Sequence, residues 1–142
     1  MARAITFTEE VSYQPLIMGG KIIWTPEVNA EYRMQGARPF ASRAIVDTGS
    51  VWCAIPDGIA VEAFDISLAE CERQVVVGIE GETAVPFTRI LVRTLGVEME
   101  CKVLLLSQNL FLIGRVPLFS MVEVGFHEEP NGARNRILYA TR

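Results

Sequence analysis

The sequence is short of several kinds of residue, and each shortage excludes a class of chemistry. Its single histidine, His127, stands beside two glutamates, so a serine or cysteine nucleophile has no suitably placed base. One histidine and three widely spaced cysteines do not supply zinc ligands at close spacing. No glycine-rich loop precedes a lysine, as a phosphate-binding loop would require. No metal or organic cofactor is therefore implied.

Basic clusters and long apolar runs are also missing. The net charge is −4 and no cluster of Lys and Arg appears, so nucleic-acid binding has no electrostatic support. The longest apolar stretches, such as 103–106 and 110–113, are far shorter than the ~20 residues of a membrane-spanning helix. The N-terminus lacks the apolar core of a secretory signal, and an odd number of cysteines suits reduced thiols. We therefore expect a cytoplasmic protein with no membrane segment in this chain.

What the sequence does contain is a repeated strand pattern. Apolar and polar residues alternate with a period of two over 28–35 and again over 97–105, as in half-buried strands. A turn at 95–96 separates the second of these strands from another over 85–94. We therefore expect an all-β fold.

The length of 142 residues suits a single domain with a real core. We expect 25–142 to form this core, with a hairpin near its end that turns at 130–132 and continues into the apolar segment 137–139. Residues 1–24 form an N-terminal extension that packs as an extra strand or remains a mobile arm. Half of the residues are hydrophobic, which fits either a well-filled core or additional apolar surface buried in a dimer.

The most informative segment is 44–50, which reads Ala-Ile-Val-Asp-Thr-Gly-Ser. Its first three residues are apolar on both faces, as a strand covered on both sides requires, and Asp47 follows directly. The chain then turns at Thr48 and Gly49, where a glycine lets backbone amides approach the carboxylate oxygens. The hydroxyl of Ser50 can donate to the ionised carboxylate and favour its charged form. The pattern predicts a carboxylate held at the end of a buried strand.

Two further segments follow this one. An apolar strand over 110–113 ends at Gly114 and Arg115, and 116–121 suits a short helix with a proline in its first turn. Between Asp47 and this strand, the segment 75–85 has valines on either side of a glycine-containing turn, which predicts a hairpin.

Taken in this order, over roughly residues 26–126, these segments resemble the retropepsin-like proteases, the single-domain homodimeric branch of the aspartic proteases. The resemblance implies a closed β-barrel-like half of an acid protease, with a flap hairpin and one short helix near the C-terminus. It implies one catalytic residue, Asp47, supported by Thr48, Gly49, Ser50 and Gly114, and a substrate-binding flap that contains Gly78, Ile79, Glu80 and Gly81.

The sequence also departs from the pattern of the retroviral enzymes. Val51 stands where those enzymes have an acidic residue that pairs with the arginine of the Gly-Arg segment. Val116 stands where the family commonly has Asn or Asp. Arg115 must therefore find another partner or face solvent.

The number of aspartates bears on the assembly. The chemistry of aspartic proteases needs two carboxylates in contact, which share one proton. The ionised carboxylate acts as the base while the protonated one polarises the peptide carbonyl. Of the three Asp in the chain, neither Asp57 nor Asp65 lies in a setting like that of Asp47. A second copy of the chain is the natural source of the missing carboxylate.

These observations predict an aspartic endopeptidase that acts on a peptide or protein substrate as a homodimer, with the two Asp47 carboxylates activating one water. The alternative is a catalytically silent peptide-binding or dimerisation module with the same fold. A third interpretation is a precursor that processes itself and loses its first 24 residues.

Overall fold

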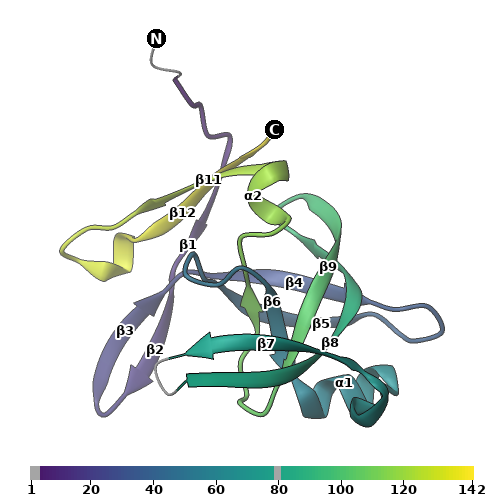
Figure 1. The fold of residues 1–142 in the computed structure, drawn as a ribbon. Helices are drawn as coiled ribbons and strands as arrows, with labels where there is room; N and C mark the ends of the chain where they lie inside the picture. The colour runs from purple at the N-terminus through teal and green to yellow at the C-terminus, as the bar shows by residue number, and fades with distance from the viewer. Residues whose placement is uncertain (1–3, 79–80) are drawn as a thin grey trace.

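The computed structural model describes residues 4–78 and 81–142, which form a mostly β protein (Figure 1). Within these residues the main sheet has seven strands, in the order β4, β5, β10, β6, β9, β8, β7. Their bounds are Glu27–Arg33 for β4, Phe40–Val46 for β5, Cys53–Pro56 for β6, Glu72–Gly78 for β7, Gly81–Thr94 for β8, Val97–Leu106 for β9 and Leu112–Ile113 for β10. Because β4 also pairs with β8, the pairing from β4 to β8 closes on itself. The structure is mostly β, with short helices, which is compatible with the predicted all-β fold.

The alternating patterns in the sequence mark the faces that form the core. On β4, Val28, Ala30 and Tyr32 are buried while the residues between them are more exposed. On β9, the same alternation buries Val97 and every second residue after it as far as Leu105. The predicted strand pair around the turn at 95–96 is confirmed, because β8 and β9 are antiparallel neighbours that join there.

The helices are short. Helix α1 covers Asp57–Phe64 and α2 covers Leu118–Met121, while 3-10 turns cover Leu68–Glu70 and Gly132–Arg134. The helix expected over 116–121 is thus shorter than predicted and begins after Pro117. The reason is steric, because a residue that precedes proline, here Val116, is disfavoured in the helical conformation. Within the described residues, neither helix has the length and apolar character that a membrane crossing requires.

The two chain ends meet in a second sheet. Strand β12 (Arg136–Thr141) lies between β1 (Glu9–Ser12) and β11 (Val122–His127), and it is antiparallel to both. The predicted terminal hairpin is therefore confirmed as the β11–β12 pair. The segment expected as an extra strand or a mobile arm supplies β1 and, after it, a separate hairpin.

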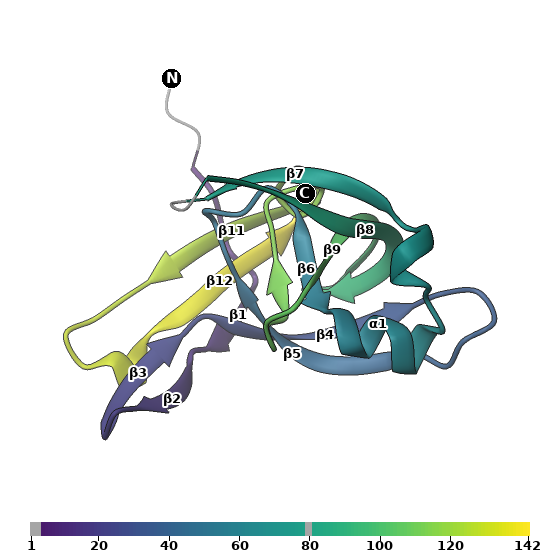
Figure 2. The same ribbon diagram turned by 60° about the horizontal axis from the view of Figure 1, so that its bottom comes forward.

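This separate hairpin consists of β2 (Gln14–Met18) and β3 (Lys21–Thr25). Its turn is formed by Gly19 and Gly20, whose φ angles of +56° and +76° are in the left-handed region that glycine adopts readily. Figures 1 and 2 both show the β2–β3 hairpin projecting from the main sheet on the same side as the β11–β12 hairpin.

Candidate functional site

Asp47 lies immediately after the end of β5, in the interior of the main sheet. Strand β5 is parallel to β10, with Val46 opposite Ile113, and the Asp47 amide donates to the Ile113 carbonyl at 2.9 Å. Ala44 and Val46 are 1% and 3% exposed, so the strand that leads into Asp47 is well buried. The backbone of Asp47 is therefore fixed by its neighbour strand, while its side chain is half-buried.

The turn after Asp47 brings a backbone donor to its carboxylate. The Gly49 amide donates to Asp47 Oδ1 at 2.9 Å, and the Ser50 amide donates to the Asp47 carbonyl at 3.2 Å. A Cβ atom at Gly49 would lie 3.2 Å from the same carboxylate oxygen, which is tighter than ordinary contact. The predicted approach of a glycine amide to the carboxylate is confirmed. Thr48, at the tip of this turn, is exposed.

The role expected for the Ser50 hydroxyl is wrong. Its Oγ donates to the Trp52 carbonyl at 2.8 Å and not to Asp47. A serine hydroxyl has one proton to donate, so it cannot also stabilise the ionised carboxylate. The Ser50 hydroxyl instead stabilises the loop that leads from Asp47 to β6, through this hydrogen bond to Trp52.

Gly114 lies where two backbone segments come into close contact. A Cβ atom at this position would lie 2.3 Å from the Trp52 carbonyl oxygen and 2.6 Å from its carbon, so only glycine fits without a backbone shift. Beyond it, the Arg115 amide donates to the Ser50 carbonyl at 2.9 Å and the Val116 amide to the Val51 carbonyl at 3.0 Å. The structure thus brings the 47–51 loop and the 113–116 segment together as one unit.

The positions that depart from the retroviral pattern lie on the surface beside this unit. Val51 and Val116 are 37% and 47% exposed. Arg115 is also exposed, and none of the ion pairs between described residues involves it. Next to the Asp47 loop, the surface therefore presents two valines in place of the acidic residue and the Asn or Asp of the retroviral pattern.

Two buried cysteines lie on adjacent strands, and the first of them follows the Asp47 loop in the chain. Cys53 begins β6 and Cys101 lies on the adjacent β9, and both are 0% exposed. The interaction between the two neighbouring thiols lowers the pKa of Cys53, and the same interaction, together with burial, raises the pKa of Cys101. Both thiols are out of contact with solvent, and the structure has no disulfide among its three cysteines.

The predicted flap corresponds to the β7–β8 hairpin, which arches over the rest of the main sheet (Figure 2). Its strands pair as far as Gly78 and Gly81, which lie opposite each other. Ile79 and Glu80, the other two predicted flap residues, lie outside the described residues.

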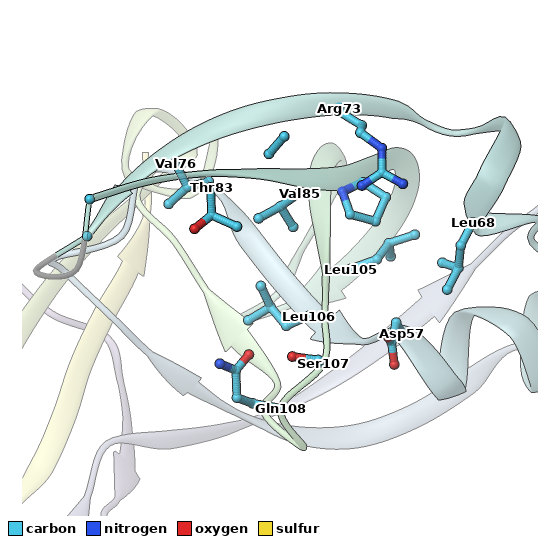
Figure 3. A pocket seen from close by; sticks show the side chains of 14 residues that line it. Asp57, Leu68, Arg73, Val76, Thr83, Val85, Leu105, Leu106, Ser107 and Gln108 are labelled. Carbon is cyan, nitrogen blue, oxygen red and sulfur yellow. The ribbon is translucent and has the colours of Figure 1, made fainter.

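A cavity of about 730 Å³ lies beneath this hairpin. Figure 3 shows Val76, Thr83 and Val85 of the hairpin on one side of it and Leu105 and Leu106, at the end of β9, on the other. Its remaining lining residues are Asp57, Leu68, Arg73, Gly78, Gly81, Ala84, Pro86, Ser107 and Gln108. Asp47 does not line this cavity, so one chain does not join the carboxylate and the space under the hairpin in a single pocket.

Thr48 borders a second cavity, of about 570 Å³, where the chain ends meet the main sheet. Tyr13 and Glu128 lie on its wall, and the Tyr13 hydroxyl donates to Glu128 Oε1 at 3.0 Å. Burial, with this hydrogen bond and the nearby negative charge, raises the pKa of Tyr13 to about 12. The N-terminal extension and the terminal hairpin are therefore tied together next to the Asp47 loop.

Some of these residues were missed in the sequence. The sequence assigns Asp57 no role, whereas it begins α1 directly after Pro56 and lines the cavity under the hairpin. A proline followed by an acidic residue is a helix-start signal that could have located it. No short-range pattern marks the contact between Tyr13 and Glu128, which are 115 positions apart.

A scan of the sequence against protein-family models found no match, and a search of curated proteins also found none. Within the described residues, no group of three or more His, Cys, Asp or Glu side chains is gathered in a way that could hold a metal ion.

Proposed function

We propose that this protein is a retropepsin-like aspartic endopeptidase that hydrolyses peptide bonds as a homodimer. The observation that carries the proposal is the setting of Asp47, a carboxylate at the end of a buried strand with the Gly49 amide 2.9 Å from its Oδ1. A carboxylate fixed by backbone groups, and half-buried where the loop reaches the surface, suits a group that must act on a water molecule.

The arrangement of the other elements supports the same proposal. The closed pairing from β4 to β8 fits the β-barrel-like half of an acid protease, and α2 fits its short helix near the C-terminus. The parallel contact between β10 and β5, with Gly114 against Trp52, fits the Gly-Arg segment that passes beside the catalytic loop.

In the proposed mechanism, the Asp47 carboxylates of two protomers flank one water. The ionised carboxylate accepts a proton as the water oxygen bonds to the peptide carbonyl carbon, and the protonated one polarises the carbonyl oxygen. A proton then passes to the amide nitrogen, the carbon–nitrogen bond breaks, and the carboxyl and amine products leave. In this proposal, the exposed Thr48 at the tip of each turn forms hydrogen bonds between the two loops.

In this proposal, the β7–β8 hairpin binds the substrate as an extended peptide. Strand β7 is last in the order of the main sheet, so its outer edge is open to pairing with a substrate strand. The largely apolar cavity beneath the hairpin is suited to apolar side chains of the substrate.

The test is cleavage of a peptide library by the wild type and by Asp47→Asn. We expect Asp47→Asn to lower the rate at least a hundredfold, because it removes the base from both half-sites at once. Asp65→Asn is the matched control, because Asp65 is exposed and its φ of 53° is one that asparagine tolerates. Unchanged cleavage by folded Asp47→Asn would refute the assignment.

A peptide-binding module without catalysis is the second candidate, because Asp47 does not line the cavity under the hairpin. It predicts that the wild type binds library peptides without cleaving them. It also predicts that Asp47→Asn binds the same peptides with unchanged affinity.

A further inference from the structure

The β2–β3 hairpin, residues 14–25, has an unusual amount of exposed apolar surface. We call this hairpin the arm. Five of its large apolar side chains face solvent: Ile17 (74% exposed), Ile22 (60%), Met18 (56%), Ile23 (45%) and Leu16 (41%). They are contiguous on one small element, whereas single exposed apolar residues are normal on any protein surface.

Both faces of the arm are apolar. Ile17 pairs with Ile22 across the ribbon, and Leu16 pairs with Ile23. Because successive side chains of a strand point to opposite faces, the two pairs lie on opposite faces of the arm. A sheet that packs on its own core has one apolar and one polar face, so this pattern indicates contact with another surface.

The base of the arm is fixed to the rest of the protein. The Trp24 ring lies so close to Gly132 that a Cβ atom there would come within 2.0 Å of Trp24 Cδ1. The Thr25 hydroxyl donates to the Gln14 carbonyl at 3.2 Å and closes the ribbon at this end. The arm therefore projects in a defined direction, beside the terminal hairpin (Figure 1).

We propose that the arm packs against a second copy of this chain and is a principal contact of the homodimer. The inference rests on the proposed function, since the Asp47 site is complete only when a second copy supplies its carboxylate. It adds a contact that the Asp47 loop does not contain, made by the N-terminal extension.

The available area suits a stable dimer. At the exposures given above, the five side chains leave on the order of 500 Å² of apolar surface per arm. Two arms, each covered by an equal area of the other copy, would bury on the order of 2,000 Å² in total, at the upper end of standard interfaces. An isolated two-stranded ribbon is marginally stable in water, so this burial would also stabilise the arm itself.

The charges favour a second copy over a lipid surface. Lys21 is the one charged residue of the arm, and the whole chain carries a net charge of −4. Anionic membranes attract clusters of several basic residues, which the arm does not have. An apolar partner surface with little charge is the better complement.

The experiment measures dimer dissociation by sedimentation velocity for the double variant Ile17→Thr/Ile22→Thr. Threonine keeps the β-branched shape that suits a strand but removes apolar surface from one face of the arm. We expect the dimer dissociation constant to rise at least tenfold. Val61→Thr is the matched control, because Val61 is 44% exposed on α1, away from the arm, and should leave the constant unchanged.

The same measurement is repeated in the Asp47→Asn background, so that assembly is tested apart from catalysis. Far-ultraviolet circular dichroism confirms that each variant is folded. A wild type that is monomeric at every concentration overturns the inference, as does a double variant that dimerises as well as the wild type. Binding of a monomeric wild type to phosphatidylcholine–phosphatidylglycerol vesicles would also overturn it. If Asp47→Asn cleaves peptides while the arm variant loses dimers, the proposed function fails and the arm contact stands.

Discussion

At the scale of single residues, Asp47 depends on backbone groups more than on neighbouring side chains. Its amide is bonded to the Ile113 carbonyl and its carboxylate to the Gly49 amide, at 2.9 Å in each case. Both contacts are set by the path of the chain, since the strand pairing and the turn place them. Substitutions that alter this path should therefore have larger effects than those that remove a side-chain hydroxyl.

Gly114→Ala should be strongly destabilising. The new Cβ atom would lie 2.3 Å from a backbone oxygen of Trp52, so one of the two segments must shift. We expect a loss of about 2–3 kcal/mol in the free energy of unfolding, measured by urea denaturation, because overpacking against backbone is not easily relieved. The shift should also lower activity, since the same segment holds the Asp47 loop.

Gly58→Ala is the control for this substitution. A Cβ atom at Gly58 meets nothing within 4 Å, and the residue lies in α1. Alanine should therefore leave stability unchanged or raise it by up to about 1 kcal/mol. A Gly114→Ala protein as stable as Gly58→Ala would contradict the close approach at Trp52.

Ser50→Ala should affect stability but not the pH dependence of cleavage. The hydroxyl donates to the Trp52 carbonyl at 2.8 Å, and its loss should cost about 1 kcal/mol in the free energy of unfolding. The pH–rate profile should stay in place, because the hydroxyl makes no bond to Asp47. A profile displaced along the pH axis would show that Ser50 acts on the carboxylate after all.

The Asp47 loop also shows what sequence reasoning can reach at this scale. The glycine amide at the carboxylate follows from the tight turn that the Asp-Thr-Gly order requires, and it was predicted. The acceptor of the Ser50 hydroxyl depends on a freely rotating side chain and on which carbonyl lies nearest. Trp52 is only two positions away, yet nothing in the sequence favours its carbonyl over the carboxylate.

At the scale of elements, the strands with strict alternation were predictable and the N-terminal hairpin was not. Strands β4 and β9 follow the period of two because each has one face on the core. The arm has apolar residues on both faces, so it has no period, although Gly19 and Gly20 between two apolar runs are a two-residue hairpin signal. The alternating pattern does not identify the arm, because apolar side chains on both faces of the arm are exposed.

The contact between the chain ends should make stability depend on alkaline pH. The pKa of Tyr13 is raised from 10.0 to about 12 in the folded protein, so the folded state holds this proton where the unfolded state has lost it. The contribution of Tyr13 is therefore complete below pH 10 and is lost progressively as the pH rises towards 12.

Tyr13→Phe tests this contribution. We expect the variant to show a shallower fall in the free energy of unfolding above pH 10 than the wild type, measured by denaturant titrations at several pH values. Some slope should remain, because burial also raises the pKa of Tyr32 and of Tyr139. Parallel curves for the two proteins would mean that the hydroxyl of Tyr13 titrates alike in both states.

At the scale of the whole molecule, the proposed mechanism needs two carboxylates, a single chain supplies only Asp47, and the apolar side chains of the arm are exposed. The Val51 and Val116 surface beside the Asp47 loop is also apolar and exposed. A contact with a second copy would cover both regions and supply the second Asp47. The number of aspartates in the sequence predicts the second copy, but no local pattern shows which surfaces it covers, because an interface is formed by two copies and not by neighbours along one chain.

Mixing of subunits tests the assembly directly. If each active unit needs Asp47 from both protomers, an equal mixture of wild type and Asp47→Asn should form active wild-type pairs in about one quarter of its dimers. Activity per wild-type chain should then fall by about half after exchange, because half of those chains are paired with an inactive partner.

The mixture is equilibrated near the dimer dissociation constant, and cleavage is followed over time. Asp65→Asn in place of Asp47→Asn should leave activity per chain unchanged. Activity that stays proportional to the amount of wild type would mean that each chain works alone, and the two-carboxylate mechanism would then be wrong.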